Sequence, residues 1–389
     1  MANSILISNI TIADALTGEF NGDIFLRGGK IVEVAPRIDR TADIHIDAAD
    51  KNWSALPGFI DVHIHGAAGF DAMDATPEAL AEIAGALPSE GTTSFLATTM
   101  TQSENAITEA LQNASRFKAS DGQAEMLGVH LEGPFISAKR AGAQPLEHIT
   151  DPSIPQFTQW QERSGNRIKL VTVAPEAENG LEFIEAVSKS GVIASIGHTD
   201  ATFEQVQEAV NKGASHVTHL YNQMSPLHHR NPGVVGASLL EDALTVEVIA
   251  DFVHSHPQSV ALAFRQKGAG RMILITDAMR AKGLDPGVYD LGGQEVQVTE
   301  TDARLSDGTL AGSILTMDAA VRNVASITGC TLADLAAMTS ANAAKELGLE
   351  QKGSIGAGKD ADITILDERF NVQLTICRGI IAYSKEELS

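Results

Sequence analysis

Residues 58–66 read GFIDVHIHG, a short apolar run that carries two histidines near its end. Seven further apolar runs follow along the chain: TTSFLATTM (92–100), MLGVHLEGP (126–134), IKLVTVAPE (168–176), GVIASIGHTD (191–200), ASHVTHLYN (214–222), LTVEVIAD (244–251) and RMILITDAM (271–279). Segments with helical periodicity separate several of them, for example TPEALAEIAGALPSE (76–90) and TFEQVQEAVNKG (202–213). Strands covered on both faces of a parallel sheet read as continuous apolar runs. Eight such strands with intervening helices predict an α/β protein built on a closed (β/α)8 TIM barrel.

The two ends of the chain have a different sequence pattern, which predicts a second domain. Residues 5–14 (ILISNITIAD), 23–36 (DIFLRGGKIVEVAP) and 43–50 (DIHIDAAD) read as short strands separated by turns. The stretch GSIGAGKDADITILDERFNVQLTICRGIIAY, from residue 353 onward, reads the same way. We therefore expect one discontinuous β-sandwich domain from residues 1–55 and 350–389, and a barrel domain from residues 56–349.

The composition excludes several classes of protein. Acidic residues (50 Asp and Glu) outnumber basic ones (28 Lys and Arg) in the 389-residue chain, which gives a formal net charge of -22. A nucleic-acid partner needs a basic surface, so none is expected, and a phosphorylated ligand would need local positive charge. No run approaches the roughly 20 apolar residues of a membrane helix, and the N-terminus lacks the pattern of a signal peptide. With two cysteines far apart, Cys330 and Cys377, we expect a cytoplasmic protein with reduced thiols and no membrane partner.

Polar side chains with metal-binding chemistry stand near the ends of the apolar runs. His63 and His65 are two residues apart, a spacing that puts both side chains on one face of a strand. Glu132 ends the third run, and the fifth, sixth and eighth runs end near His198, His219 and Asp277. Each of these residues alone has a structural explanation as a buried, hydrogen-bonded group. Together, at the strand ends that form the active-site face of such a barrel, they make a ligand set for a divalent metal.

Several motifs carry a family resemblance that covers nearly the whole chain. The set HxH, HLEGP, GHT, THLYN and TDAM resembles the amidohydrolase superfamily. More narrowly, THLYNQMSPLHHRNPG (218–233) and GTLAGSILTM (308–317) resemble the N-acetylglucosamine-6-phosphate deacetylases. This resemblance implies metal-dependent hydrolysis of the acetamido group of an amino-sugar phosphate. Another amidohydrolase reaction, on a cyclic amide or an N-acyl amino acid, and a catalytically silent binding module are the alternatives.

The resemblance also implies how metal is held. It assigns the metal-binding carboxylate to Glu132, with His198 and His219, since no lysine follows the fourth run. His63 and His65 could bind a second metal, with Glu132 bridging the two metals and Asp277 near the second. The number of metals per subunit is therefore expected to be one or two. Zinc suits this set best, and iron, cobalt or manganese are the alternatives. Asp277 is expected to act as the general base and then as the general acid.

Substrate contacts follow from the same resemblance. The residues expected to bind substrate are Ala143, Gln144, Asn222, Gln223, Arg230, His254, Ala311 and Gly312. Arg230 is expected to reach the phosphate bound by a neighbouring subunit, which implies a homodimer. Gln144 stands where the family usually has a histidine that polarises the scissile carbonyl. That difference leaves open whether the sugar is the glucosamine or the galactosamine isomer.

Overall fold

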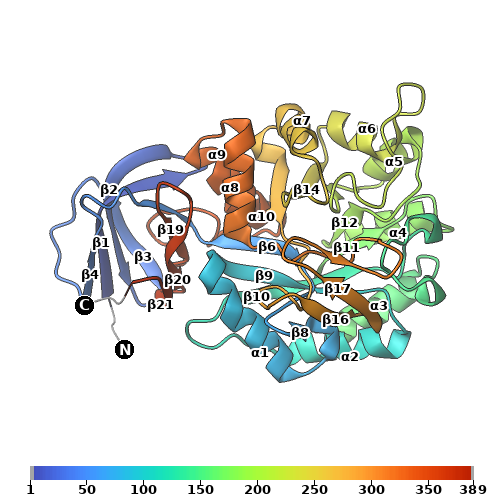
Figure 1. The fold of residues 1–389 in the computed structure, drawn as a ribbon, viewed down its shortest axis with the longest axis horizontal. Helices are drawn as coiled ribbons and strands as arrows, with labels where there is room; N and C mark the ends of the chain where they lie inside the picture. Colours follow the sequence, from blue (N-terminus) through green and yellow to red (C-terminus); the bar gives the residue numbers. More distant parts are fainter. Residues whose placement is uncertain (1–3, 387–389) are drawn as a thin grey trace.

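The computed structural model describes residues 4–386 and contains a closed barrel of parallel strands (Figure 1). In sheet order the strands are β15 (Met272–Ile275), β14 (Thr245–Ile249), β13 (His216–Val217), β12 (Ile193–Ile196), β11 (Ile168–Val173), β10 (Glu125–Glu132), β9 (Thr92–Thr99) and β6 (Phe59–Ile64). Backbone hydrogen bonds close the barrel, because Asp277 N donates to His63 O (2.8 Å) and His65 N donates to Ala278 O (2.9 Å). The predicted (β/α)8 barrel is confirmed.

Helices surround the barrel and follow its strands. They are α1 (Pro77–Ala86), α2 (Glu104–Arg116), α3 (Ile154–Arg163), α4 (Gly180–Lys189), α5 (Phe203–Asn211), α6 (Gly233–Leu240), α7 (Pro257–Lys267) and α8 (Met317–Thr328), then the short α9 (Leu332–Ala336) and α10 (Asn342–Glu346). Local sequence explains where they begin. The side chain of Thr76 caps α1, which has proline in its first turn, and Thr202 and Gln205 form a capping box at the start of α5.

Both termini contribute to a second, separate sheet, as expected. Its strands are β1 (Ser4–Asp14), β2 (Gly18–Arg27), β3 (Lys30–Ala35), β4 (Ile44–Asp47), β5 (Ser54–Pro57), β19 (Ile363–Leu366), β20 (Val372–Cys377) and β21 (Ile380–Ser384). All eight are linked by hydrogen bonds into one sheet, and apolar side chains of β1, β2, β4, β19 and β20 pack in a single cluster. β5 spans the predicted limit between residues 55 and 56, and the division into two domains at the predicted limits stays a prediction.

An antiparallel insertion that was not expected from the sequence follows the last barrel strand. It consists of β16 (Gly287–Leu291), β17 (Gln294–Val298) and β18 (Ala303–Arg304). Its apolar side chains, with Leu291 and Val296 among them, pack on Met100 and Met279 at the carboxyl ends of the barrel strands. A smaller hairpin, β7 (Gly66–Ala67) and β8 (Phe70–Asp71), follows β6. The insertion therefore forms part of the rim around the barrel mouth.

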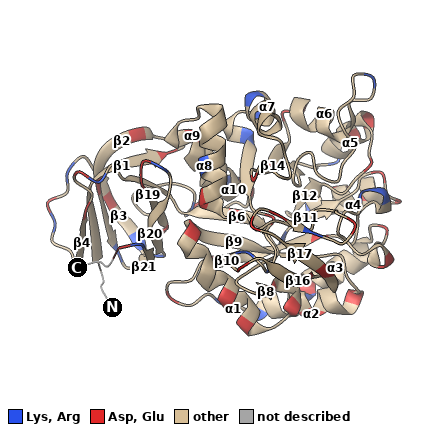
Figure 2. Cartoon of the chain, in the orientation of Figure 1, with Lys and Arg blue, Asp and Glu red and all other residues tan. Residues whose placement is uncertain are grey.

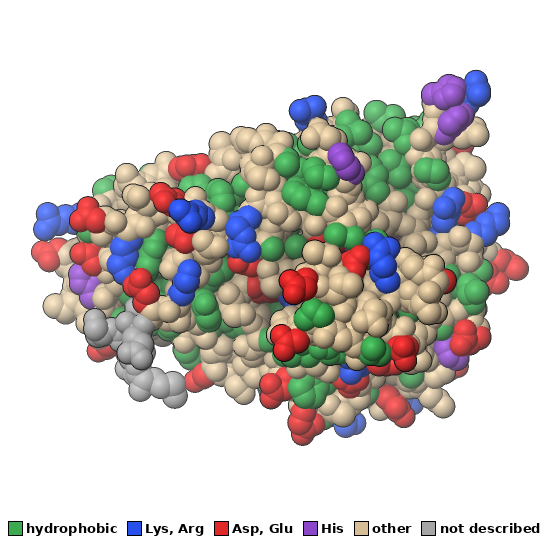
Figure 3. Space-filling view, viewed as in Figure 1, with side chains coloured by type: hydrophobic (Ala, Val, Ile, Leu, Met, Phe, Trp, Pro, Cys, Tyr) green, Lys and Arg blue, Asp and Glu red, His purple; other side chains and the backbone are tan. Residues whose placement is uncertain are grey.

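The surface agrees with the acidic composition. Asp and Glu positions are spread along the outer helices and the terminal sheet (Figure 2). Histidine and basic side chains gather on a loop that projects beside α6 (Figure 3), and residues 226–231 of this loop are exposed. Within residues 4–386, no helix has the length and apolar character needed to cross a membrane.

Candidate metal-dependent active site

The six residues expected as metal ligands lie together at the carboxyl ends of the barrel strands. His63 lies in β6 and His65 directly follows it, while Glu132 is the last residue of β10. His198, His219 and Asp277 each lie two residues beyond the end of a strand. These last three have left-handed backbones, with φ of 46°, 31° and 49°. Such backbones cost roughly 1–3 kcal/mol each and persist where the surrounding structure imposes them, as functional sites do.

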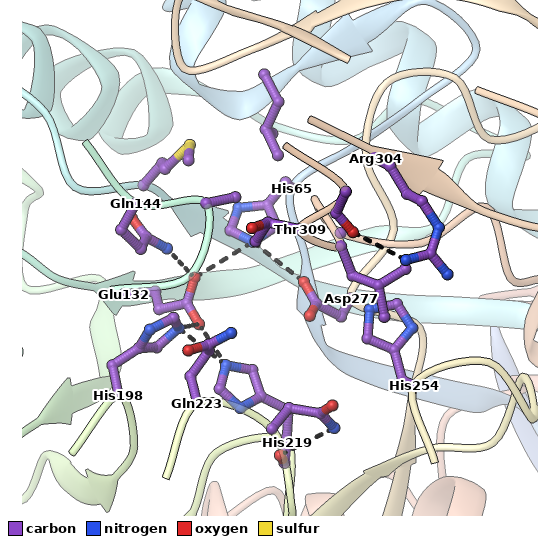
Figure 4. Close-up of a pocket in the computed structure, with 17 residues that line it drawn as sticks. His65, Glu132, Gln144, His198, His219, Gln223, His254, Asp277, Arg304 and Thr309 are labelled. Atoms are coloured by element: carbon purple, nitrogen blue, oxygen red, sulfur yellow. Dashed lines mark hydrogen bonds and ion pairs between the residues drawn. The ribbon is translucent and has the colours of Figure 1, made fainter. Parts of the chain in front are cut away.

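The ligands form two groups that meet at Glu132 (Figure 4). In the first ligand group (His63, His65 and Asp277), the histidine Nε2 atoms lie 3.5 and 3.3 Å from Asp277 Oδ1. In the second ligand group (Glu132, His198 and His219), the histidine Nε2 atoms lie 3.2 and 3.1 Å from Glu132 Oε1. Glu132 Oε1 also lies 3.4 Å from His63 Nε2, and its Oε2 lies 3.3 Å from His65 Nε2. The carboxylate of Glu132 therefore faces both groups.

The donor atoms fit a divalent cation in each group. Nε2 of His198 and Nε2 of His219 face each other at 3.0 Å, and both point at the same carboxylate oxygen. Nε2 of His63 is buried and makes no hydrogen bond to the described residues. Unpaired buried nitrogens are costly, and imidazole with carboxylate is the ligand set that zinc and related metals prefer. The arrangement is therefore that of a site for a divalent metal.

Without metal, the carboxylates hold protons on the histidines of the first ligand group. Burial lowers the pKa of His65, but its hydrogen bonds to Asp277 and Glu132 outweigh that effect and raise the pKa to about 10. Burial likewise opposes, and nearby carboxylates raise, the pKa of His63 well above its ordinary value. The histidines in turn hold the pKa of Glu132 and Asp277 below the ordinary value, against the effect of burial. Metal binding must therefore displace protons from this group.

A buried carboxylate that the sequence analysis missed supports the ligands from behind. Glu247 Oε2 lies 2.9 Å from His63 Nδ1 and accepts a hydrogen bond from His219 N (3.1 Å). Its other oxygen lies 3.0 Å from His216 Nε2, and His216 Nδ1 lies 2.6 Å from Glu346 Oε2. Outer carboxylates of this kind orient metal-binding histidines. A single charged residue inside the apolar run LTVEVIAD was the signal that could have revealed Glu247.

Gln144 is held in one orientation. Its Oε1 accepts a hydrogen bond from Thr101 N (2.7 Å), so its Nε2 is turned to Glu132 Oε2 and donates to it (2.8 Å). The residue therefore contacts the shared carboxylate directly, in addition to lining the pocket described next.

A pocket of about 330 Å³ lies above the two ligand groups. Among the residues expected to bind substrate, those that line it are Ala143, Gln144, Asn222, Gln223, His254 and Gly312. Ala311 does not line it, and its N–H donates to Ala303 O. Arg230 does not line it either and lies on the exposed loop of residues 226–231. Leu291, Arg304 and residues 308–310 line it without having been expected, because they belong to the missed insertion and the loop after it.

Comparisons with known proteins agree with this geometry. The model of the amidohydrolase family matches residues 54–381. An N-acetylglucosamine-6-phosphate deacetylase of Lysinibacillus sphaericus is 52% identical over 380 residues, which cover 97% of each chain. The enzyme of that name from Bacillus subtilis (strain 168) is 48% identical over 392 residues, covering 100% of this chain and 99% of its own. The crystal structure of the Thermotoga maritima N-acetylglucosamine-6-phosphate deacetylase superposes with a TM-score of 0.87 at 37% identity, covering 98% of this chain and 100% of its own. The chain therefore belongs to the amidohydrolase family and, within it, to the N-acetylglucosamine-6-phosphate deacetylases.

Proposed function

We propose that this protein hydrolyses the acetamido group of N-acetylglucosamine 6-phosphate to give glucosamine 6-phosphate and acetate. The observation that carries the proposal is the pair of ligand groups that share Glu132 at the floor of a pocket, with Asp277 beside them. The choice of substrate rests on the names of the relatives. The pocket supplies room for one sugar ring above the ligands.

Asp277 is the residue that we assign to proton transfer. When bound, a divalent metal lowers the pKa of water and polarises the acetamido carbonyl. The carboxylate of Asp277 lies beside the first ligand group, with its Oδ1 3.3 Å from His65 Nε2 and 3.5 Å from His63 Nε2, and it accepts a proton from the attacking water. As the carbon–nitrogen bond breaks, Asp277 returns that proton to the sugar nitrogen, and acetate and the free amine leave.

We assign the other ligands to holding metal. Zinc is the metal that we propose, because imidazole and carboxylate donors suit it, with iron, cobalt and manganese as alternatives. Two metals per subunit are proposed, since each ligand group offers two histidines and the carboxylate of Glu132 faces both groups. Glu132, whose carboxylate faces both groups, would help to hold both metals.

The quaternary arrangement and the compartment are also part of the proposal. Arg230 lies on an exposed loop, away from the pocket of its own chain, and would reach the substrate phosphate in a partner subunit of a homodimer. Asn222 and Gln223 would contact the sugar phosphate from the same chain. Both cysteines are free, in keeping with a reducing cytoplasm.

Acetate release is the test. The substrates are N-acetylglucosamine 6-phosphate, its galactosamine isomer and unphosphorylated N-acetylglucosamine, each with and without a chelator. Rapid release that the chelator abolishes, with the glucosamine phosphate as the best substrate, is expected. Faster release from the galactosamine isomer would reassign the sugar. No release from any of the three, by protein shown to contain metal, would refute the proposed reaction.

A further inference from the structure

A single guanidinium faces the pocket from the insertion above the barrel. Arg304 ends β18 and is the only lysine or arginine among the described residues that line the pocket. The floor of the pocket carries two carboxylates, Glu132 and Asp277, and the chain as a whole is strongly acidic. A sugar phosphate brings a further charge of about -1.5 to -2. Such a ligand needs a local cation, and among the described residues that line the pocket Arg304 supplies one.

The side chain of Arg304 is already held in place. Its Nε donates to Asp302 Oδ2 (2.7 Å), and its Nη1 donates to Gly308 O (2.9 Å). Asp302 is fixed in turn, because its Oδ1 accepts from the hydroxyl of Thr299 (2.7 Å). The hydroxyl of Thr299 and the guanidinium of Arg304 hold the pKa of Asp302 below its ordinary value, so the carboxylate stays ionised. Orienting Arg304 therefore costs little when a ligand arrives.

The guanidinium keeps donors free for a ligand. Nη2 and the second hydrogen of Nη1 have no hydrogen-bond partner among the described residues, and 42% of the side chain is exposed. Arg304 lies on the same side of the pocket as His254, away from Gln144 (Figure 4). His254 is oriented by Asp251, whose Oδ2 lies 2.6 Å from its Nδ1. The two residues thus form one polar corner.

The position of this corner suits the far end of a sugar phosphate. In a hexopyranose, the substituents at C2 and C6 lie on opposite sides of the ring. With the C2 acetamido group at the ligand groups, the C6 phosphate is directed to another part of the pocket. Arginine binds phosphate through two parallel hydrogen bonds, and a lysine offers only a point charge.

We propose that Arg304 binds the phosphate of the substrate from within the same chain, in addition to the contact from Arg230 of a second subunit. The inference rests on the proposed function, since it takes the ligand to be a sugar 6-phosphate. It makes the insertion of β16–β18 a part of substrate recognition. A structural clamp within the insertion, with Arg304 paired only to Asp302 and Gly308, is the competing role.

Binding of glucose 6-phosphate to the metal-loaded protein tests the proposal without requiring catalysis. Arg304→Gln is expected to weaken this binding at least about tenfold, because a charge-assisted pair is lost. Arg304→Lys should weaken it by a smaller factor. Arg271→Gln is the matched control, since Arg271 is also 42% exposed and pairs with an aspartate (Asp242, 2.9 Å) but lies outside the pocket. It should bind as the wild type does.

Kinetics separate the two roles. Arg304→Gln should raise KM for N-acetylglucosamine 6-phosphate far more than it lowers kcat, and it should affect unphosphorylated N-acetylglucosamine much less. Equal losses for both sugars, or unchanged glucose 6-phosphate binding in a folded Arg304→Gln or Arg304→Lys protein, would overturn the proposal. Wild-type protein that binds glucose 6-phosphate, with the predicted loss in Arg304→Gln, but releases no acetate would refute the proposed function alone.

Discussion

The two ligand groups that meet at Glu132 are supported from behind by different chemistry. In the first ligand group, His63 Nδ1 lies against the buried carboxylate of Glu247 at 2.9 Å. In the second, His198 Nδ1 lies 2.8 Å from the backbone oxygen of Arg140, in the loop after β10. The carboxylate of Glu247 therefore supports an imidazole of the first group but only the backbone N–H of His219 in the second. The imidazole of His198 in the second group is supported by a neutral backbone oxygen. Metal binding in the first group should depend on charge and pH more than in the second.

The largest effect is expected from a change that leaves both groups able to bind metal. Asp277→Asn keeps the shape and an oxygen donor but removes the proton acceptor. We expect kcat to fall by about 10²–10⁴-fold while metal content changes little. Metal content, measured by mass spectrometry, and the rate of acetate release are compared between the wild type and the variant. An Asn variant with near wild-type turnover would remove Asp277 from proton transfer.

The next change acts on the support of the first ligand group. Glu247→Gln removes the negative charge behind His63. It should lower the metal affinity of the first ligand group by about 10–100-fold, as loss of a carboxylate behind a metal-binding histidine does. The hydrogen bond from His219 N to Glu247 predicts a smaller loss in the second group. Calorimetric titration of metal-free protein measures both affinities.

Glu346→Gln is the control for this variant. Glu346 ends the same chain of hydrogen bonds but touches neither ligand group, since its contact is with His216. We expect little change in either affinity. Equal weakening of both metals by Glu247→Gln, or an equal effect of Glu346→Gln, would break the distinction between the groups.

The pH dependence of stability should show the same asymmetry. In metal-free protein the pKa of His65 is raised to about 10 from an ordinary 6.5. A raised pKa of a base stabilises the fold fully below the unfolded value, and this stabilisation is lost as the pH rises through the folded value. The Tm of metal-free protein should therefore fall between about pH 6.5 and about pH 10, and metal affinity should rise over that range. His65→Asn should flatten the fall; an unchanged slope would contradict the assignment.

The smallest effect is expected at the side of Glu132 that Gln144 touches. Gln144→Ala removes one hydrogen bond to a charged group, and a loss of kcat/KM of about tenfold is expected. Gln144→His should shift the ratio of kcat/KM between the glucosamine and galactosamine phosphates. Unchanged ratios and rates in both variants would show that the residue has no part in recognition or in holding Glu132.

Much of the architecture could be read from local patterns. The apolar runs predicted the barrel strands because strands covered on both faces leave few polar positions, and polar side chains at their ends marked the mouth. Glu247 was missed because its partners, His63 and His216, are distant in sequence and only barrel closure brings them together. Arg304 was missed although the segment carried a hairpin signal: Gly292 and Gly293 separate two short stretches in which buried and exposed residues alternate.

Metal titration with a kinetic readout tests the central claim most directly. Metal-free protein would be titrated with zinc while bound metal per chain and acetate release from N-acetylglucosamine 6-phosphate are measured together. The account predicts two zinc ions per chain, with activity rising until both ligand groups are filled. Saturation at one zinc per chain with full activity would contradict the shared role of Glu132. Folded protein with two zinc ions and no acetate release would contradict the proposed reaction.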